Sequence, residues 1–203
     1  MNADDLAALE LVLVRHGEST WNAERRWQGQ LDPPLSARGR EQSRALGREL
    51  GGEGVRVIVA SDLVRARDTA RLAAGELGCA FELEPRLREL DVGVWGGLTI
   101  ETIAARWPEE LARLRAGDLD VRPGGGESRR ELRVRVMAAL ESAAARHAGA
   151  RVAVVTHAGV VRTLLWTLRL DNARWHRTDL GALRRVEHEP PWRPAMARGP
   201  ELE

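Results

Sequence analysis

The sequence predicts an α/β fold, in the form of a single three-layer αβα domain around a mostly parallel central sheet. Three stretches support this prediction, because each reads as an apolar strand and is followed further on by a segment with helical periodicity. They are "LELVLV" from residue 9, "VRVIVAS" from residue 55 and "RVAVVTHAG" from residue 151. Alternation of strands and helices is typical of β-α-β units, whose helices cover both faces of a parallel sheet.

The first two helices are expected in the N-terminal half. One should span residues 36–50, with Ser36 as its N-cap and Gly51 just past its end. The other should run from about Asp62 to Leu77, before a third strand candidate that begins the stretch "FELEP" at residue 81.

The C-terminal half adds an irregular region and a long helix. Residues 86–127 are rich in Pro and Gly and are interpreted as an inserted subregion carried by the sheet. Residues 128–147 have apolar side chains at helical spacing and predict a helix with one buried face. We expect one domain over residues 1–203, with its core at about 9–188 and a Pro-rich tail at 189–203.

Composition excludes several classes of protein. The net charge is +1, and all 31 basic residues are Arg, so a single Arg is weak support for any function. Near-balanced charge argues against binding to nucleic acid or to a membrane, and no apolar run reaches the length of a membrane helix. The lone cysteine, Cys79, and an acidic N-terminus without a signal peptide favour the cytoplasm.

Polar side chains follow three of the predicted strands. Because the carboxyl ends of parallel strands meet at one edge of a sheet, we expect these side chains to converge on one pocket. They are Arg15 and His16 after the first strand, Ser61 and Arg65 after the second, and Thr156 and His157 after the last.

These residue types favour phosphate chemistry. The planar guanidinium of Arg matches phosphate oxygens, and helix N-termini add partial positive charge. A neutral His can attack phosphorus and form a covalent intermediate, and a carboxylic acid such as Glu89 can protonate the leaving alkoxide. Asp91 is the nearest competitor for the role of acid.

Six motifs in order give the chain a family resemblance. It resembles the histidine phosphatase superfamily, also called phosphoglycerate mutase-like, over about residues 11–160. The motifs are "RHGE" followed by Asn22, "WQGQLDPPLSARGREQ", "SDLVRARDTA", "RLRELDVGVWGGLT", "GGGES" and "VVTHAG".

The resemblance implies roles for individual residues. His16 would be the nucleophile that becomes phosphohistidine, and Glu89 would be the general acid and base. Arg15, Arg65 and His157 would bind the phosphoryl group and complete the catalytic set. The resemblance implies no metal ion and no organic cofactor, and it adds substrate contacts from the matching motifs at Asn22, Gln28, Gly29 and Ala158.

A phosphatase is favoured over a mutase. Mutases of this family follow the acid with Arg and a Tyr-containing segment and carry a Lys-bearing loop, whereas here Leu90 and Asp91 follow Glu89 and the chain has neither Tyr nor Lys. We therefore expect a phosphomonoesterase that acts on a small phosphorylated metabolite. Cofactor-dependent phosphoglycerate mutase-type transfer and non-catalytic binding of a phospho-ligand stay open as alternatives. So do the substrate itself and the choice between a monomer and a homodimer.

Seven Trp residues in a chain with one Phe and no Tyr suggest a further hypothesis. Trp21 and Trp27 lie in the loop after the "RHGE" motif, and Trp95 follows the proposed acid. We expect at least one of them to line the leaving-group side of the pocket.

Overall fold

The computed structural model describes residues 10–167, 175–178 and 181–186, and within these a six-stranded sheet has the order β3-β2-β4-β1-β6-β5. Four neighbouring strands are parallel and the last two are antiparallel. The parallel strands are β1 (Glu10–Arg15), β2 (Val57–Ala60), β3 (Ala80–Leu83) and β4 (Arg151–Thr156), and the antiparallel strands are β5 (Trp175–Thr178) and β6 (Gly181–Val186). The α/β fold with a mostly parallel sheet is therefore confirmed.

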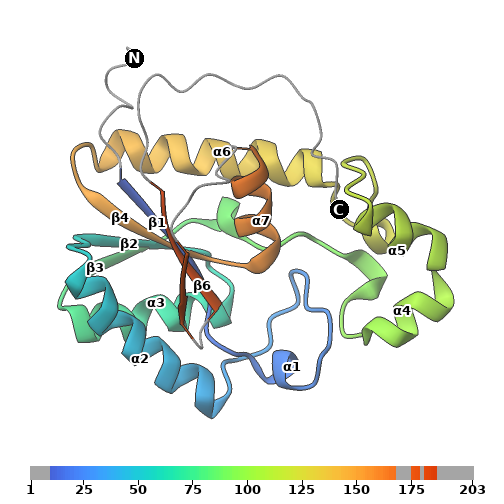
Figure 1. Ribbon diagram of the computed structural model, residues 1–203, viewed down its shortest axis with the longest axis horizontal. Coiled ribbons are helices and arrows are strands. Elements are labelled where there is room, and N and C mark those ends of the chain that lie inside the picture. Colours follow the sequence, from blue (N-terminus) through green and yellow to red (C-terminus); the bar gives the residue numbers. More distant parts are fainter. Residues whose placement is uncertain (1–9, 168–174, 179–180, 187–203) are drawn as a thin grey trace.

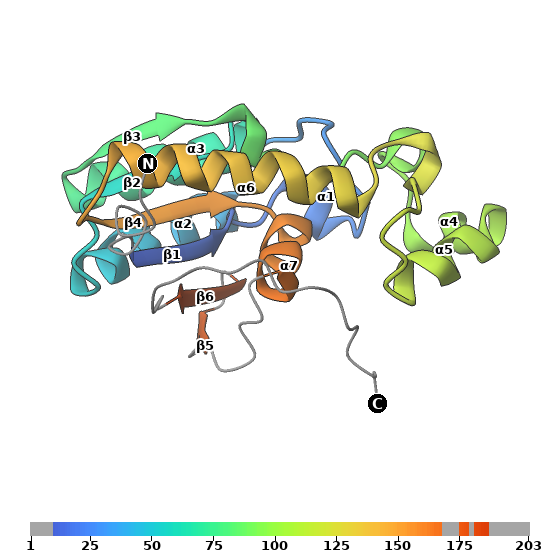
Figure 2. The ribbon, with the colours of Figure 1, turned by 90° about the horizontal axis from the view of Figure 1, so that it is seen from above.

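Helices cover both faces of the sheet, as the alternation in the sequence predicts. Figure 1 shows α6 above the sheet and α2 and α3 below it, and Figure 2 shows α6 and α7 from above. The bounds are Ala37–Gly52 for α2, Val64–Leu77 for α3, Arg129–Arg146 for α6 and Ala158–Thr167 for α7.

Alternating residues of β1 divide the core into two parts. Leu11 and Leu13 belong to the cluster that includes apolar residues of α6 and α7. Val12 and Val14 belong to the cluster that includes apolar residues of α2 and α3. Because successive side chains of a strand point to opposite faces, each face of the sheet is buried under its own pair of helices.

The region between β3 and α6 lies beyond the carboxyl ends of the strands. It contains the helices α4 (Ile100–Arg106) and α5 (Pro108–Arg115), joined to the rest by turns and short 3₁₀ segments. The short helix α1 (Thr20–Ala23) lies at the same end of the sheet (Figure 1). These elements surround the edge where the strands deliver their polar residues.

Several boundaries differ from the sequence prediction. Gly51 lies inside α2, because the helix continues to Gly52 and is capped by Glu53. The N-cap of α3 is Leu63, which offers no side-chain oxygen; instead the carboxylate of Asp32 accepts a hydrogen bond from the N–H of Val64 at 2.7 Å. The antiparallel edge was not predicted, and the Pro-rich tail at 189–203 lies outside the described residues.

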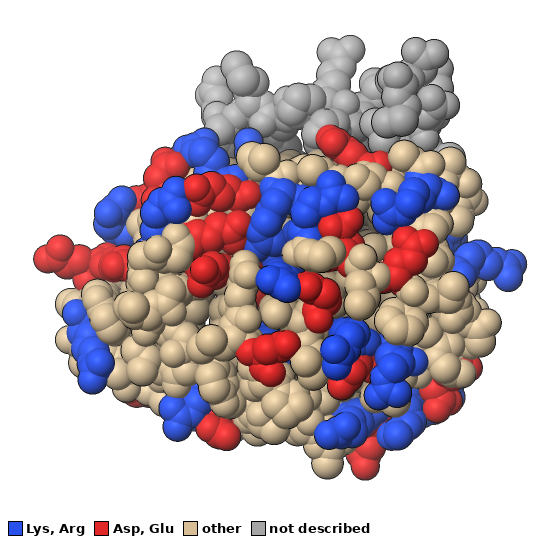
Figure 3. Space-filling view, turned by 180° about the vertical axis from the view of Figure 1, so that it is seen from behind, with Lys and Arg blue, Asp and Glu red and all other residues tan. Residues whose placement is uncertain are grey.

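The surface opposite to the view of Figure 1 carries charges of both signs. In Figure 3 the Arg side chains and the acidic side chains are interleaved over this face. None of the helices in the described part of the chain has the length and apolar character needed to cross a membrane.

Candidate active site

A pocket of about 170 Å³ lies where the carboxyl ends of the parallel strands meet. Eight of the nine residues predicted for the site line it. They are Arg15, His16, Asn22, Gln28, Gly29, Arg65, Glu89 and Ala158. The ninth, His157, is fully buried beside the ring of His16, and the exposed Asp91 does not line the pocket.

The hydrogen bonds of His16 leave one of its ring nitrogens unprotonated. Its Nδ1 lies 2.6 Å from the carbonyl oxygen of Gly17, which can only accept a hydrogen bond, so Nδ1 carries the proton. The lone pair is then on Nε2, where Nε–H of Arg65 donates to it at 3.3 Å. In this tautomer Nε2 is the ring nitrogen with a lone pair directed at its surroundings and Nδ1 is not.

The loop that carries His16 is seated against two helices. The N–H of Gly17 donates to Oγ1 of Thr69 on α3 at 3.0 Å. A Cβ atom at Gly17 would come within 2.6 Å of the carbonyl oxygen of Gly39 on α2. The glycine is therefore required for close packing, and that packing fixes where the imidazole lies.

Arg65 joins the nucleophile to the loop opposite. Its side chain is fully buried, and its two terminal nitrogens donate to the carbonyl oxygens of Gly29 at 2.7 Å and Leu31 at 2.8 Å. Burial lowers the pKa of Arg65 to about 10, against the opposing influence of nearby Glu89, so it stays charged at neutral pH. Three of its five N–H groups are used, which leaves two for a ligand.

The imidazole ring of His157 packs beside that of His16. Its Nε2 lies 2.9 Å from Oγ of Ser61, the residue that follows β2, and the two imidazole centroids are 5.1 Å apart. Its Nδ1 is buried and has no hydrogen-bond partner among the described residues.

Both histidines are neutral in the folded protein. Burial is the main cause that lowers their pKa values well below the ordinary 6.5, and the positive charge of Arg65 acts in the same direction on each. A neutral imidazole is the form that can attack phosphorus.

The lowered pKa values predict a loss of stability in mild acid. Below pH 6.5 the unfolded chain binds protons on His16 and His157, whereas both residues stay unprotonated in the folded chain. The free energy of unfolding therefore falls as the pH decreases toward the lowered pKa values. Each histidine should contribute a slope of up to about 1.4 kcal/mol per pH unit. Urea unfolding of the wild type and His157→Gln from pH 5 to 8 measures this. The variant should show a shallower slope below pH 6.5 and a parallel curve above it; equal slopes below pH 6.5 would contradict the assignment.

Glu89 reaches the pocket from the segment after β3. Its two carboxylate oxygens accept hydrogen bonds from the N–H of Leu90 at 2.8 Å and the N–H of Gly159 at 3.0 Å. A Cβ atom at Gly159 would lie 2.3 Å from the carboxylate, so any other residue at the start of α7 would displace the carboxylate from this position. Both oxygens are thus oriented by backbone groups.

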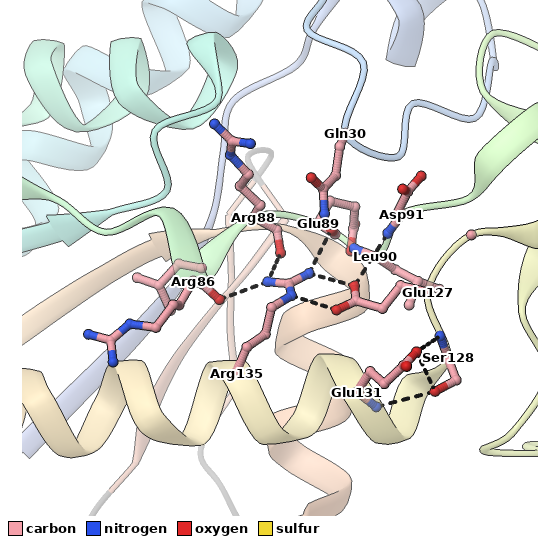
Figure 4. A network of polar contacts seen from close by, with 12 residues as sticks. Gln30, Arg86, Arg88, Glu89, Leu90, Asp91, Glu127, Ser128, Glu131 and Arg135 are labelled. Atoms are coloured by element: carbon pink, nitrogen blue, oxygen red, sulfur yellow. Dashed lines mark hydrogen bonds and ion pairs between the residues drawn. The ribbon is translucent and has the colours of Figure 1, made fainter.

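The backbone of the segment that carries Glu89 is fixed by Arg135 (Figure 4). From α6, this side chain donates to the carbonyl oxygens of Arg86 at 2.7 Å, Arg88 at 2.6 Å and Glu89 at 2.9 Å. Its remaining N–H groups bind both carboxylate oxygens of Glu127 at 2.7 Å. All five donors are used, so Arg135 fixes the backbone geometry of the proposed acid.

Removing this side chain should reduce both stability and activity. In Arg135→Met three carbonyl groups lose a donor and Glu127 loses its partner, which should cost roughly 3 kcal/mol of unfolding free energy. The matched control is Arg146→Met, which breaks the more exposed ion pair with Glu82 on the same helix and should cost under about 1 kcal/mol. Chemical unfolding measures both, and kcat for an alkyl phosphate should fall in Arg135→Met alone. Equal losses in the two variants would show that Arg135 has no special positioning role.

Some residues that line the pocket were not predicted. Arg162 lines it from α7, four residues after Ala158, and Arg26 lines it from the loop after α1. The same spacing that links Ser61 to Arg65 could have revealed Arg162. Arg26 donates to the carbonyl oxygen of Gly97, a contact that no local pattern in the sequence indicates.

One of the three Trp residues lies at the pocket, and its place on the leaving-group side stays a prediction. Trp27 lines the pocket, whereas Trp21 does not. Trp95 does not line the pocket either: it is fully buried in the core, and its ring centroid lies 5.6 Å from that of Trp27 and 6.1 Å from that of Trp107.

Comparison with known proteins adds independent information. A model of the histidine phosphatase superfamily (branch 1) matches residues 11–191. The probable phosphoglycerate mutase GpmB of Enterobacter sp. (strain 638) is 39% identical over 195 residues, which cover 91% of this chain and 87% of that protein.

Solved structures are also similar. A mycobacterial glucosyl-3-phosphoglycerate phosphatase, solved in complex with VO3, is 38% identical with a TM-score of 0.70, and the match covers 79% of this chain and 82% of that one. YhfR of Bacillus stearothermophilus is 29% identical with a TM-score of 0.76, over 91% of this chain and 98% of that one.

Proposed function

The chain belongs to the histidine phosphatase superfamily, and from that membership and the geometry of its pocket we propose that it is a phosphomonoesterase. It hydrolyses a small phosphorylated metabolite through a phosphohistidine on His16 and needs no metal ion or organic cofactor. One observation supports this most strongly: the unprotonated Nε2 of a neutral imidazole shares a small pocket with one carboxylate, that of Glu89, and four guanidiniums, those of Arg15, Arg26, Arg65 and Arg162.

The first step transfers the phosphoryl group to the enzyme. Arg15, for which no ion pair is found among the described residues, and the two remaining donors of Arg65 bind the phosphoryl oxygens. Nε2 of His16 attacks phosphorus as the bond from phosphorus to the leaving oxygen breaks. Glu89 gives its proton to that oxygen, and the Nδ1–H bond to the carbonyl of Gly17 stabilises the positive charge that develops on the ring.

The second step releases phosphate. Glu89, now ionised, takes a proton from a water molecule, whose oxygen attacks phosphorus while the bond to Nε2 breaks. The imidazole returns to its neutral tautomer and Glu89 to its acid form. In both steps Nδ1 of His157, buried without a partner among the described residues, is available to donate to a phosphoryl oxygen. Nδ1 of His157 carries the ring proton when the hydroxyl of Ser61 donates its hydrogen bond to Nε2 of the same ring.

Mutase activity is the second candidate, because the curated relatives are named as probable phosphoglycerate mutases. Hydrolysis is favoured because this chain has neither Lys nor Tyr with which to build the substrate loop of the mutase branch. The phosphatase name of a solved relative points the same way.

A direct test separates the two reactions. Release of inorganic phosphate is measured for a panel of phosphomonoesters with a chelator present, and interconversion of 2- and 3-phosphoglycerate is measured in parallel. The proposal expects chelator-resistant release with interconversion at least about 100-fold slower. Interconversion that is faster than release would establish the mutase instead. If neither reaction is observed, non-catalytic binding of a phospho-ligand is the function that is left.

A further inference from the structure

We propose that a second cavity, adjoining the phosphoryl pocket, binds a second anionic group on the alcohol part of the substrate. The inference rests on the proposed function and adds a substrate class: a phosphomonoester whose carbon skeleton carries a carboxylate or phosphate at its other end.

The cavity has a volume of about 410 Å³ and lies between the end of α5, the first turns of α6, and α7. Trp27, Leu90, Gly159 and Arg162 line both this cavity and the phosphoryl pocket. A substrate seated with its phosphoryl group at His16 therefore has room for its alcohol part in the second cavity, which we call the annex.

Four arginines that line the annex have no carboxylate partner among the described residues: Arg115, Arg129, Arg133 and Arg162. Other arginines of α6 behave differently. Arg130, Arg135 and Arg146 pair with Asp120, Glu127 and Glu82. Because the chain is rich in Arg, this contrast within one helix is the informative observation: the half-buried Arg129 and Arg133 are the members left uncompensated beside a cavity.

Arg162 connects the two cavities, because its side chain lines both of them. The charge of Arg162 lowers the pKa of Arg15 on one side and of Arg129 on the other, in each case in addition to burial. Cations that lie close enough for the charge of one to lower the pKa of another are stabilised by an anion placed between them. An oxyanion of the substrate would relieve this repulsion, and the Arg fork suits carboxylate and phosphate alike.

Apolar side chains also line the annex, together with Thr163 and the paired Arg130. Trp27, Trp166, Leu114 and Leu132 line it, so the part of the substrate between its two anionic ends should be a carbon skeleton that can bury apolar surface. This arrangement disfavours compact esters such as glycerol phosphate, which would leave the annex unfilled.

Binding to a variant that cannot turn over tests the inference independently of catalysis. ω-Phosphonooxy carboxylic acids of increasing chain length, the matching carboxamides and the matching phosphonates are titrated calorimetrically into His16→Ala. At the best chain length the acid and the phosphonate should each bind roughly 10- to 100-fold more tightly than the neutral amide.

The preference should fall when the annex loses two of its unpaired arginines. Adding Arg129→Gln and Arg133→Gln should bring the ratio of acid to amide affinity below about 3, while the amide affinity changes little. The control is Arg146→Gln, which removes one positive charge of the same helix away from the annex and should preserve the ratio.

The outcomes separate the two proposals. Equal binding of acid and amide at every chain length, or an unchanged ratio in the double variant, would overturn the annex as an anion site and leave the phosphatase standing. If the wild type hydrolyses no ester, the proposed function fails, and the binding ratio still decides whether the annex recognises an anion.

Discussion

Replacing His16 by alanine is expected to lower kcat/KM for every phosphomonoester by roughly 10⁴-fold or more. No other side chain can take over, because His16 is the one histidine among the described residues that line the pocket, and His157 does not line it. The variant should keep its affinity for phosphate, since Arg15 and Arg65 remain in place. Loss of turnover with retained binding is the pattern expected for a missing nucleophile.

Two measurements make this result specific. Rapid quenching of the wild type into alkali after mixing with a labelled ester should trap a base-stable, acid-labile phosphoenzyme, and His16→Ala should give none. His147→Ala is the matched control, because His147 lies at the far end of α6 beside Glu82. A His16→Ala enzyme within tenfold of the wild type, or a wild type without trapped label, would exclude the phosphohistidine route.

The strand-end residues of the site could be predicted from the sequence. An apolar run that ends at Arg15 and His16 identifies a strand and its carboxyl end, and in a parallel sheet such ends must lie together. The register confirms why this works: Arg15 lies opposite Thr156 in the β1–β4 pair, so the residues that follow them emerge side by side. The convergence is a consequence of topology, which periodicity can reveal.

The residues that position the acid could not be predicted in the same way. Arg135 acts through the carbonyl oxygens of residues 86, 88 and 89, and every residue type offers such a carbonyl. In a chain with 31 basic residues, all Arg, nothing in the sequence distinguishes Arg135 from its exposed neighbours. The same limit applies to Gly159, whose importance comes from the closeness of the Glu89 carboxylate to the place that a Cβ atom would take.

Glu89→Gln is expected to lower kcat most for esters whose leaving group is a weakly acidic alcohol. The substitution keeps the size of the side chain and one acceptor for the N–H of Gly159, and it removes the proton donor. Alkyl phosphates, whose alkoxide must be protonated as it leaves, should lose about 10²- to 10⁴-fold in kcat. p-Nitrophenyl phosphate, whose phenolate leaves unprotonated, should lose less than about tenfold in the transfer step.

A series of esters with graded leaving groups therefore assigns the acid. The logarithm of the transfer rate should depend more steeply on the acidity of the leaving alcohol in Glu89→Gln than in the wild type. Asp91→Asn is the control, because Asp91 is exposed, binds the N–H of Gly93 at 2.9 Å and does not line the pocket. If Glu89→Gln slows all esters equally, the carboxylate orients the pocket and gives no proton. If instead the transfer rate of Asp91→Asn depends steeply on the acidity of the leaving alcohol, Asp91 is the acid, although it does not line the pocket.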